Sequence, residues 1–136
     1  MVKKIAKKEP KEKEETLGLL DVIIEAMFEK KAQNIISLDL SLLDNSVCKY
    51  FVICNADSTT QVSAIAENIE DSTREQLNER VWRKDGLDNS LWVVLDYGDV
   101  VAHVFQTECR SFYRLEDLWA DAELKLYKDE NSILRA

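Results

Sequence analysis

The stretch LWVVLDYGDVVAHVF, residues 91–105, decides how this chain folds, because it has the pattern of two strands joined by a tight turn. Its two flanking runs are rich in β-branched and aromatic residues, which favour strands. Gly98 and Asp99 separate the runs, and glycine at the first central position suits a two-residue hairpin turn. The stretch therefore predicts a β-hairpin in which Trp92 pairs with Phe105 and Asp96 pairs with Val101.

Because side chains alternate between the two faces of a strand, this hairpin is expected to have one apolar face and one mixed face. The apolar face is predicted to lie in the core and carries Leu91, Val93, Leu95, Tyr97, Val100, Ala102 and Val104. The mixed face carries Trp92, Val94, Asp96, Val101, His103 and Phe105. An exposed aromatic pair among a few polar groups is typical of the anchors of protein interfaces.

The mixed face has three other interpretations. For catalysis, Asp96 would orient its diagonal neighbour His103 as a general base, yet no convincing nucleophile follows, since Cys109 and Ser111 lie beyond the strand. A metal ion needs three or four converging ligands, and only Asp96, His103 and Asp99 are in range. His103 could instead be a histidine satisfied beneath a covering helix. The residues favour a binding surface over a catalytic or metal site and leave the buried histidine open.

Other patterns predict the elements around the hairpin. A first helix is expected to begin at Thr16 as its N-cap, with an apolar face made of Leu20, Ile23, Ile24, Met27 and Phe28. Strands are expected at 34–40, 50–56 and 81–84. A capping box of Ser58 and Gln61 predicts the start of a second helix, whose buried stripe is Val62, Ile65, Ala66, Ile69 and Leu77. The stretch FYRLEDLWADAEL, residues 112–124, is expected to end the domain in helical turns.

Strands interleaved with helices predict one α/β domain with a mixed β-sheet flanked by helices. This domain is expected to span residues 16–122. It would lie between a flexible charged tail at 1–15 and a C-terminal tail at 123–136, because both ends are polar and lack sustained periodicity.

Composition limits the classes of function. The formal net charge is −8, and residues 1–15 hold six Lys and four Glu, so the rest of the chain is more acidic still. An acidic body repels phosphate backbones, so a basic protein is a better partner than nucleic acid. Three cysteines without C-x-x-C spacing suggest neither disulfides nor a zinc site. No run has the length of a membrane span or the pattern of a secretory signal, so a cytoplasmic location is expected.

Three motifs in this order resemble the ribosomal silencing factor family, RsfS or Iojap. They are YFVICNADSTTQVSAIAENIE (50–70), WVVLDYGDVVAHVF (92–105) and RSFYRLEDLWADA (110–122). The resemblance implies a fold similar to nucleotidyltransferases but without catalytic motifs, because the Gly-Ser pair and the D-x-D carboxylates that hold two metal ions are both missing. It thus implies a protein that is not an enzyme and that has no catalytic residue, no cofactor and no metal site.

The resemblance also implies a partner. Family members bind the large ribosomal subunit through its ribosomal protein number fourteen, block the joining of the small subunit and so repress translation when nutrients run short. Carried over to this sequence, the docking residues are Trp92, Phe105, Tyr113 and Glu116, with Asp96, Asp99 and His103 in supporting roles. A homodimer of the free protein is implied as well. The rival classes are an enzyme acting on nucleotides and an interaction module with another partner.

Overall fold

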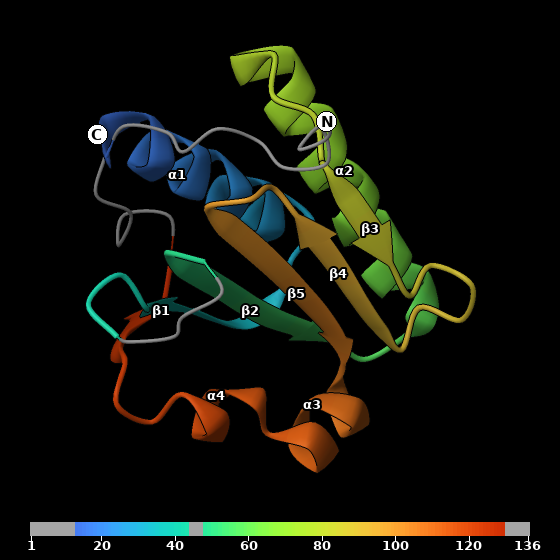
Figure 1. Cartoon of the computed structure of the whole chain (residues 1–136). Coiled ribbons are helices and arrows are strands. Elements are labelled where there is room, and N and C mark those ends of the chain that lie inside the picture. The colour runs from blue at the N-terminus through green and yellow to red at the C-terminus, as the bar shows by residue number, and fades with distance from the viewer. Residues whose placement is uncertain (1–12, 44–47, 130–136) are drawn as a thin grey trace, which may run out of the picture.

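The computed structural model describes residues 13–43 and 48–129, and these form a six-stranded sheet with helices on both faces (Figure 1). Along the sheet the strand order is β3-β4-β5-β2-β1-β6. The strands are β1 (Gln33–Asp39), β2 (Tyr50–Ala56), β3 (Arg83–Asp85), β4 (Trp92–Asp96), β5 (Val100–Gln106) and β6 (Glu123–Tyr127). Only the central pair, β2 and β5, is parallel, so the predicted α/β fold with a mixed sheet is confirmed.

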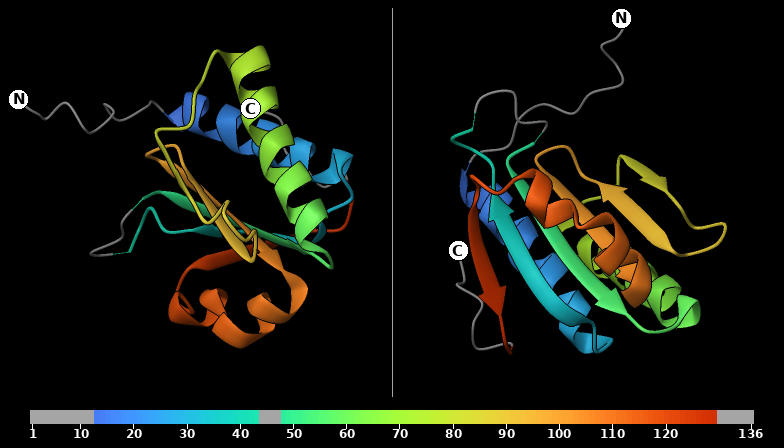
Figure 2. Two further views of the ribbon diagram at one scale, coloured as in Figure 1. Left: turned by 90° about the vertical axis from the view of Figure 1, so that its right-hand side faces the viewer. Right: turned by 90° about the horizontal axis from the view of Figure 1, so that it is seen from below.

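Two layers of helices enclose this sheet. The long helices α1 (Lys13–Glu29) and α2 (Thr59–Leu77) pack on one face, and the short helices α3 (Thr107–Tyr113) and α4 (Leu115–Leu118) lie on the other (Figure 2). Each face consequently has its own apolar cluster, the larger beneath α1 and α2 and the smaller beneath α3 and α4. The smaller cluster contains the mixed face of the hairpin.

The hairpin of β4 and β5 has the predicted register. Trp92 pairs with Phe105 and Asp96 with Val101, and the amide of Tyr97 donates to the carbonyl of Val100 at 2.9 Å. Gly98 in the turn has a φ of 92°, a value that glycine adopts at little cost. The predicted core face is fully buried from Val93 to Val104. Leu91 is the exception, since it precedes β4 and is 39% exposed.

The first helix begins earlier than predicted. α1 starts at Lys13, so the predicted tail is wrong for residues 13–15, and residues 1–12 lie outside the described chain. Thr16 is not the N-cap but a buried residue inside the helix, where its hydroxyl donates to Asp99 Oδ2 at 3.3 Å. The prediction followed the preference of threonine for N-caps, and it missed the partner Asp99 because that residue is 83 positions away in the sequence.

The start of α2 agrees with half of the predicted capping box. Ser58 Oγ accepts from the amide of Gln61 at 3.1 Å, so the N-cap is confirmed. The side chain of Gln61 instead donates to the carbonyl of Lys30 at 3.0 Å and links α2 to the end of α1. Leu77 is 41% exposed and does not belong to the buried stripe, because it is the last residue of the helix.

The sheet continues where the C-terminal tail was predicted. Residues Glu123–Tyr127 form β6, which pairs antiparallel with β1, and the hydroxyls of Tyr127 and Ser37 are hydrogen-bonded at 3.0 Å. The predicted domain end at residue 122 and the predicted helical turns at 123–124 are therefore wrong. Residues 130–136 lie outside the described chain.

Candidate functional site

The mixed face of the hairpin is largely covered by α3 and α4. The chain turns directly from β5 into α3, which brings both short helices back over β5 and β2 (Figure 2). Beneath them Phe105 is 0% exposed, and His103 and Val101 are also buried. The prediction of an exposed aromatic pair is thus wrong for Phe105, because the period of a strand gives the face of a residue but not what covers that face.

Three aromatic side chains reach the surface beside this cover. Trp92 is half-buried, Tyr113 is 52% exposed and Phe112 is 79% exposed. The ring centroids of Trp92 and Tyr113 are 5.0 Å apart, and those of Tyr113 and Phe112 are 5.1 Å apart. We call these three residues the aromatic surface. Sequence reasoning missed Phe112, although its place directly before Tyr113 could have suggested it.

The aromatic surface borders a shallow hollow, and Phe105 lies behind its Trp92. The hollow has a volume of about 470 Å³ and is lined by Asp85, Gly86, Asn89, Leu91, Trp92, Val94, Cys109 and Tyr113. Phe105 stacks against Trp92 with 4.8 Å between ring centroids. Among the predicted docking residues, the structure thus brings Trp92 and Tyr113 together at the surface and places Phe105 behind them.

His103 is a buried hydrogen-bond partner of Trp92. Its Nδ1 accepts a hydrogen bond from Trp92 Nε1 at 3.1 Å, so the imidazole is neutral with its hydrogen on Nε2. That Nε2 is enclosed and has no hydrogen-bond partner within residues 13–43 and 48–129. The ring of His103 also contacts the ring of Phe51, with 4.6 Å between their centroids. Burial lowers the pKa of His103 to about 3.

This buried histidine makes stability depend on pH in a predictable direction. The pKa of His103 is near 6.5 in the unfolded chain and about 3 in the folded protein, so between these values only the unfolded chain binds a proton. The stability that the neutral, buried imidazole contributes is therefore complete above pH 6.5 and is lost as pH falls toward 3. Between pH 7 and pH 5 we expect the free energy of unfolding to fall by about 2 kcal/mol through this group. Urea denaturation at both pH values measures the change.

A His103→Gln variant is the control, because the chain has no other histidine. In that variant the loss between pH 7 and pH 5 is expected to disappear. A loss of equal size in the variant would assign the effect to other groups.

The two hairpin aspartates lie away from the aromatic surface. Asp96 accepts from the amide of Gly98 at 2.8 Å and approaches Arg83 at 3.8 Å, so it does not orient His103. Asp99 lies in the turn, at the opposite end of the hairpin from Trp92, and is 4.0 Å from Lys49 Nζ. The structure therefore does not bring Asp96 and Asp99 together with the predicted docking residues.

Glu116 contacts Arg110 beneath the corner between α3 and α4. One oxygen, Oε2, is 3.2 Å from Arg110 Nη2, and Oε1 is enclosed without a hydrogen-bond partner among the described residues. Arg110 also reaches Asn34 and Asn55. No sequence pattern singles out Arg110, because its contacts with the sheet come from strands more than fifty residues away.

The described residues contain no cluster of metal ligands, and two of the three cysteines, Cys48 and Cys54, are buried. In residues 13–43 and 48–129, no three His, Cys, Asp or Glu side chains converge as metal ligands. Burial raises the pKa of Cys48 and of Cys54 to about 12, which makes both thiols poor nucleophiles. None of the helices in this part of the chain has the length and apolar character needed to cross a membrane.

Known proteins similar to this chain share both sequence and fold. A ribosomal silencing factor RsfS from Bacillus subtilis is 42% identical over 107 residues, which cover 79% of this chain and 89% of that protein. The chloroplastic protein Iojap of Zea mays is 38% identical over 74 residues, 54% of this chain and 32% of that protein. A crystal structure from Chromobacterium violaceum superposes with a TM-score of 0.71 at 32% identity, covering 75% of this chain and 83% of the other.

A second solved structure, from Bacillus halodurans, has a TM-score of 0.66 at 36% identity and covers 74% of this chain and 92% of the other. The family model described as "Ribosomal silencing factor during starvation" matches residues 11–135, nearly the whole sequence. On this match and on the identity to its curated members, the chain belongs to the RsfS family of ribosomal silencing factors.

Proposed function

We propose that this protein binds the large ribosomal subunit through its ribosomal protein number fourteen and blocks the joining of the small subunit. Translation would fall as a result, above all when nutrients are limited. Membership of the RsfS family supports a silencing role. The observation that carries the docking proposal is the aromatic surface, in which Phe112 and Tyr113 are exposed and the half-buried Trp92 stacks on Phe105.

The chemistry of this surface suits a protein partner. Tryptophan and tyrosine are enriched among the residues that contribute most to binding at interfaces. The net charge of −8 would steer the protein toward a basic partner such as a ribosomal protein, and burial of the aromatic rings would then hold the complex. Silencing by obstruction requires no chemical step, so the protein would act in the cytoplasm as a regulator and not as an enzyme.

The predicted docking residues would contribute in different ways. Trp92 and Tyr113 would contact the partner directly, together with Phe112. Phe105 and His103 would act from beneath by fixing the position of Trp92. Glu116, predicted as a docking residue, becomes a weaker candidate because it pairs with Arg110, and Asp96 and Asp99 keep their supporting roles. The negative charge of these three carboxylates would contribute through steering more than through buried contacts.

Self-association of the free protein is a related proposal. A surface that places an aromatic anchor in solvent can bury it against a second copy, since a two-fold dimer uses the same patch on both subunits. We propose that such a homodimer forms through the aromatic surface and competes with the ribosome for it.

The test is sedimentation of purified large and small subunits through a sucrose gradient, with and without this protein, in magnesium that favours joining. We expect the protein to travel with the large subunit and the peak of joined ribosomes to shrink. Ribosomes that join as before, with the protein left at the top of the gradient, would contradict the proposed function.

A further inference from the structure

The short helix α3 carries two of the three residues of the aromatic surface but is weakly held by apolar contacts. None of its seven residues is fully buried, and only Cys109 packs partly against the apolar cluster beneath. Phe112 and Tyr113 at its end face outward. Since hydrophobic burial stabilises in proportion to the area removed from water, other contacts must fix the position of this helix.

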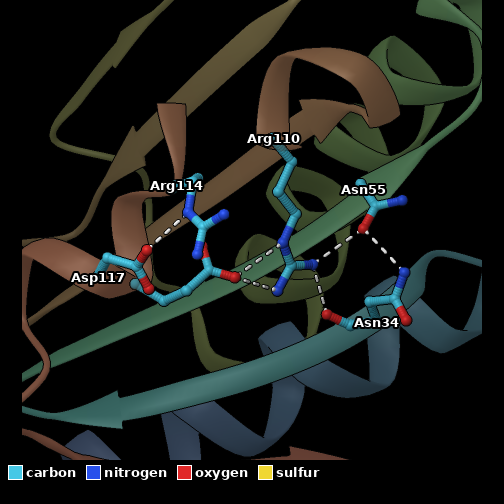
Figure 3. Close-up of polar contacts among 6 residues, drawn as sticks. Asn34, Asn55, Arg110, Arg114 and Asp117 are labelled. Carbon is cyan, nitrogen blue, oxygen red and sulfur yellow. Dashed lines mark hydrogen bonds and ion pairs between the residues drawn. The ribbon is translucent and has the colours of Figure 1, made fainter. Parts of the chain in front are cut away.

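Arg110, in the middle of α3, supplies such contacts to three other elements. Its Nη1 donates to the carbonyl of Asn34 in β1 at 2.6 Å and to Asn55 Oδ1 in β2 at 2.9 Å. Its Nε and Nη2 both donate to Glu116 Oε2 in α4, at 3.4 and 3.2 Å. The Arg110 side chain is only 11% exposed, and Figure 3 shows its charge-assisted hydrogen bonds to Asn34 and Asn55.

The strand beneath is shaped to receive Arg110. Pairing between β1 and β2 shifts its register between Gln33 and Ile36, as in a β-bulge, and Asn34 within this bulge has a φ of 52°. A bulged residue is left out of the regular ladder of the sheet, which frees its carbonyl for another donor. The Asn34 side chain also donates to Asn55 Oδ1 at 3.3 Å, so both asparagines are held where Arg110 meets them.

A second set of hydrogen bonds fixes the start of α3. Asn55 Nδ2 donates to Thr107 Oγ1 at 3.0 Å, and Thr107 Oγ1 donates to Asp57 Oδ1 at 2.7 Å. Asn55 therefore binds both Thr107 and Arg110, which are one turn apart on the helix. With these two points fixed on one strand, the rotation of α3 over the sheet is determined.

We propose that Arg110 is a positioning residue that sets Tyr113 against Trp92 and thereby shapes the aromatic surface. The 5.0 Å separation of the two rings depends on where α3 lies, and Arg110 is the side chain that joins α3 to β1, β2 and α4 together. This inference rests on the proposed docking function of that surface.

Lysine cannot replace arginine here, although it keeps the charge. Guanidinium places several donors in a fixed plane, whereas an ammonium is a single point of charge on a flexible stem. One nitrogen cannot reach the carbonyl of Asn34, the amide oxygen of Asn55 and the carboxylate of Glu116 from the middle of α3 at once. Arg110→Lys therefore removes the geometry of the contact and leaves the net charge unchanged.

The first measurement concerns the free protein. Two-dimensional NMR is expected to show nuclear Overhauser contacts between the rings of Trp92 and Tyr113 in the wild type and to lose them in Arg110→Lys. Arg114→Lys is the matched control, because Arg114 pairs with Asp117 on the exposed side of the same corner and is 70% exposed. Ring contacts that persist in Arg110→Lys would overturn the proposal.

The second measurement is binding to the large subunit, read as a double-mutant cycle. We expect Arg110→Lys to weaken binding about tenfold in the wild type, and by less than about twofold in a Tyr113→Ala background, where Tyr113 no longer has a ring to position. Equal weakening in both backgrounds would overturn the proposal. If the wild type does not bind the subunit, the proposed function fails, while the ring contacts still decide the role of Arg110.

Discussion

Trp92→Ala is expected to weaken binding to the large ribosomal subunit by about 30-fold or more and to abolish the block of subunit joining. Trp92 lies at the centre of the aromatic surface, with Phe105 stacked behind it and His103 fixing its indole N–H. Truncation of a central aromatic anchor of this kind costs about 2 kcal/mol or more in protein interfaces. Titration of labelled protein against large subunits measures the loss of affinity.

Trp82→Ala is the matched control. Trp82 is also half-buried, but it lies next to β3, where its amide donates to the carbonyl of Asp96 at 2.8 Å. Binding is expected to be unchanged in this variant. A folded Trp92→Ala protein that binds like the wild type would contradict the assigned surface. If the free protein dimerises through the same surface, light scattering should show that Trp92→Ala is monomeric.

Phe105→Ala is expected to lower the free energy of unfolding by about 3–5 kcal/mol, because it leaves a cavity in the smaller apolar cluster. Phe105 is 0% exposed and stacks on Trp92 at 4.8 Å. Any loss of ribosome binding in Phe105→Ala should follow from the lost support of Trp92 and not from a lost contact with the ribosome. Urea denaturation measures the stability, and Phe105→Leu, which keeps most of the apolar volume, should lose far less.

Phe112→Ala is the matched comparison for Phe105→Ala, because it truncates an exposed phenylalanine and not a buried one; urea denaturation and ribosome binding are measured for both. Phe112 is 79% exposed, so its truncation should change stability by no more than about 0.5 kcal/mol. If Phe105→Ala were equally mild, Phe105 would have to be accessible, as the sequence had suggested. In that case its role in docking would be direct.

Local rules predicted the hairpin and failed where distant segments meet. Gly98 fixes the turn and the alternation of side chains fixes the register. The pairs from Trp92–Phe105 to Asp96–Val101 could therefore be predicted from a stretch of fifteen residues. The capping by Ser58 is equally local. These contacts depend only on neighbours in sequence, and the sequence therefore contains all the information that they need.

Three features required knowledge of the whole fold. Leu124 and Leu126 in β6 are half exposed, so this strand lacks the apolar signal that marks a buried one. The burial of Phe105 depends on a helix that returns over the sheet. The contacts of Arg110 depend on a bulge 76 residues away along the chain. Neither periodicity nor propensity describes contacts between distant segments. Trp92 and Tyr113 could therefore be predicted from the sequence, whereas the residues that support them could not.

Pairing of β6 with β1 has a consequence for when the protein becomes active during its own synthesis. Strand β1 is formed by residues 33–39, yet its outer edge is covered only by residues 123–127. A chain leaves the ribosome from its N-terminus, so β1, which also receives Arg110 through Asn34, lacks this neighbour until Tyr127 has emerged. We expect the aromatic surface to take its final shape only after β6 has left the ribosome and paired with β1. A nascent chain that has not yet released β6 would then lack the finished surface that we propose for docking.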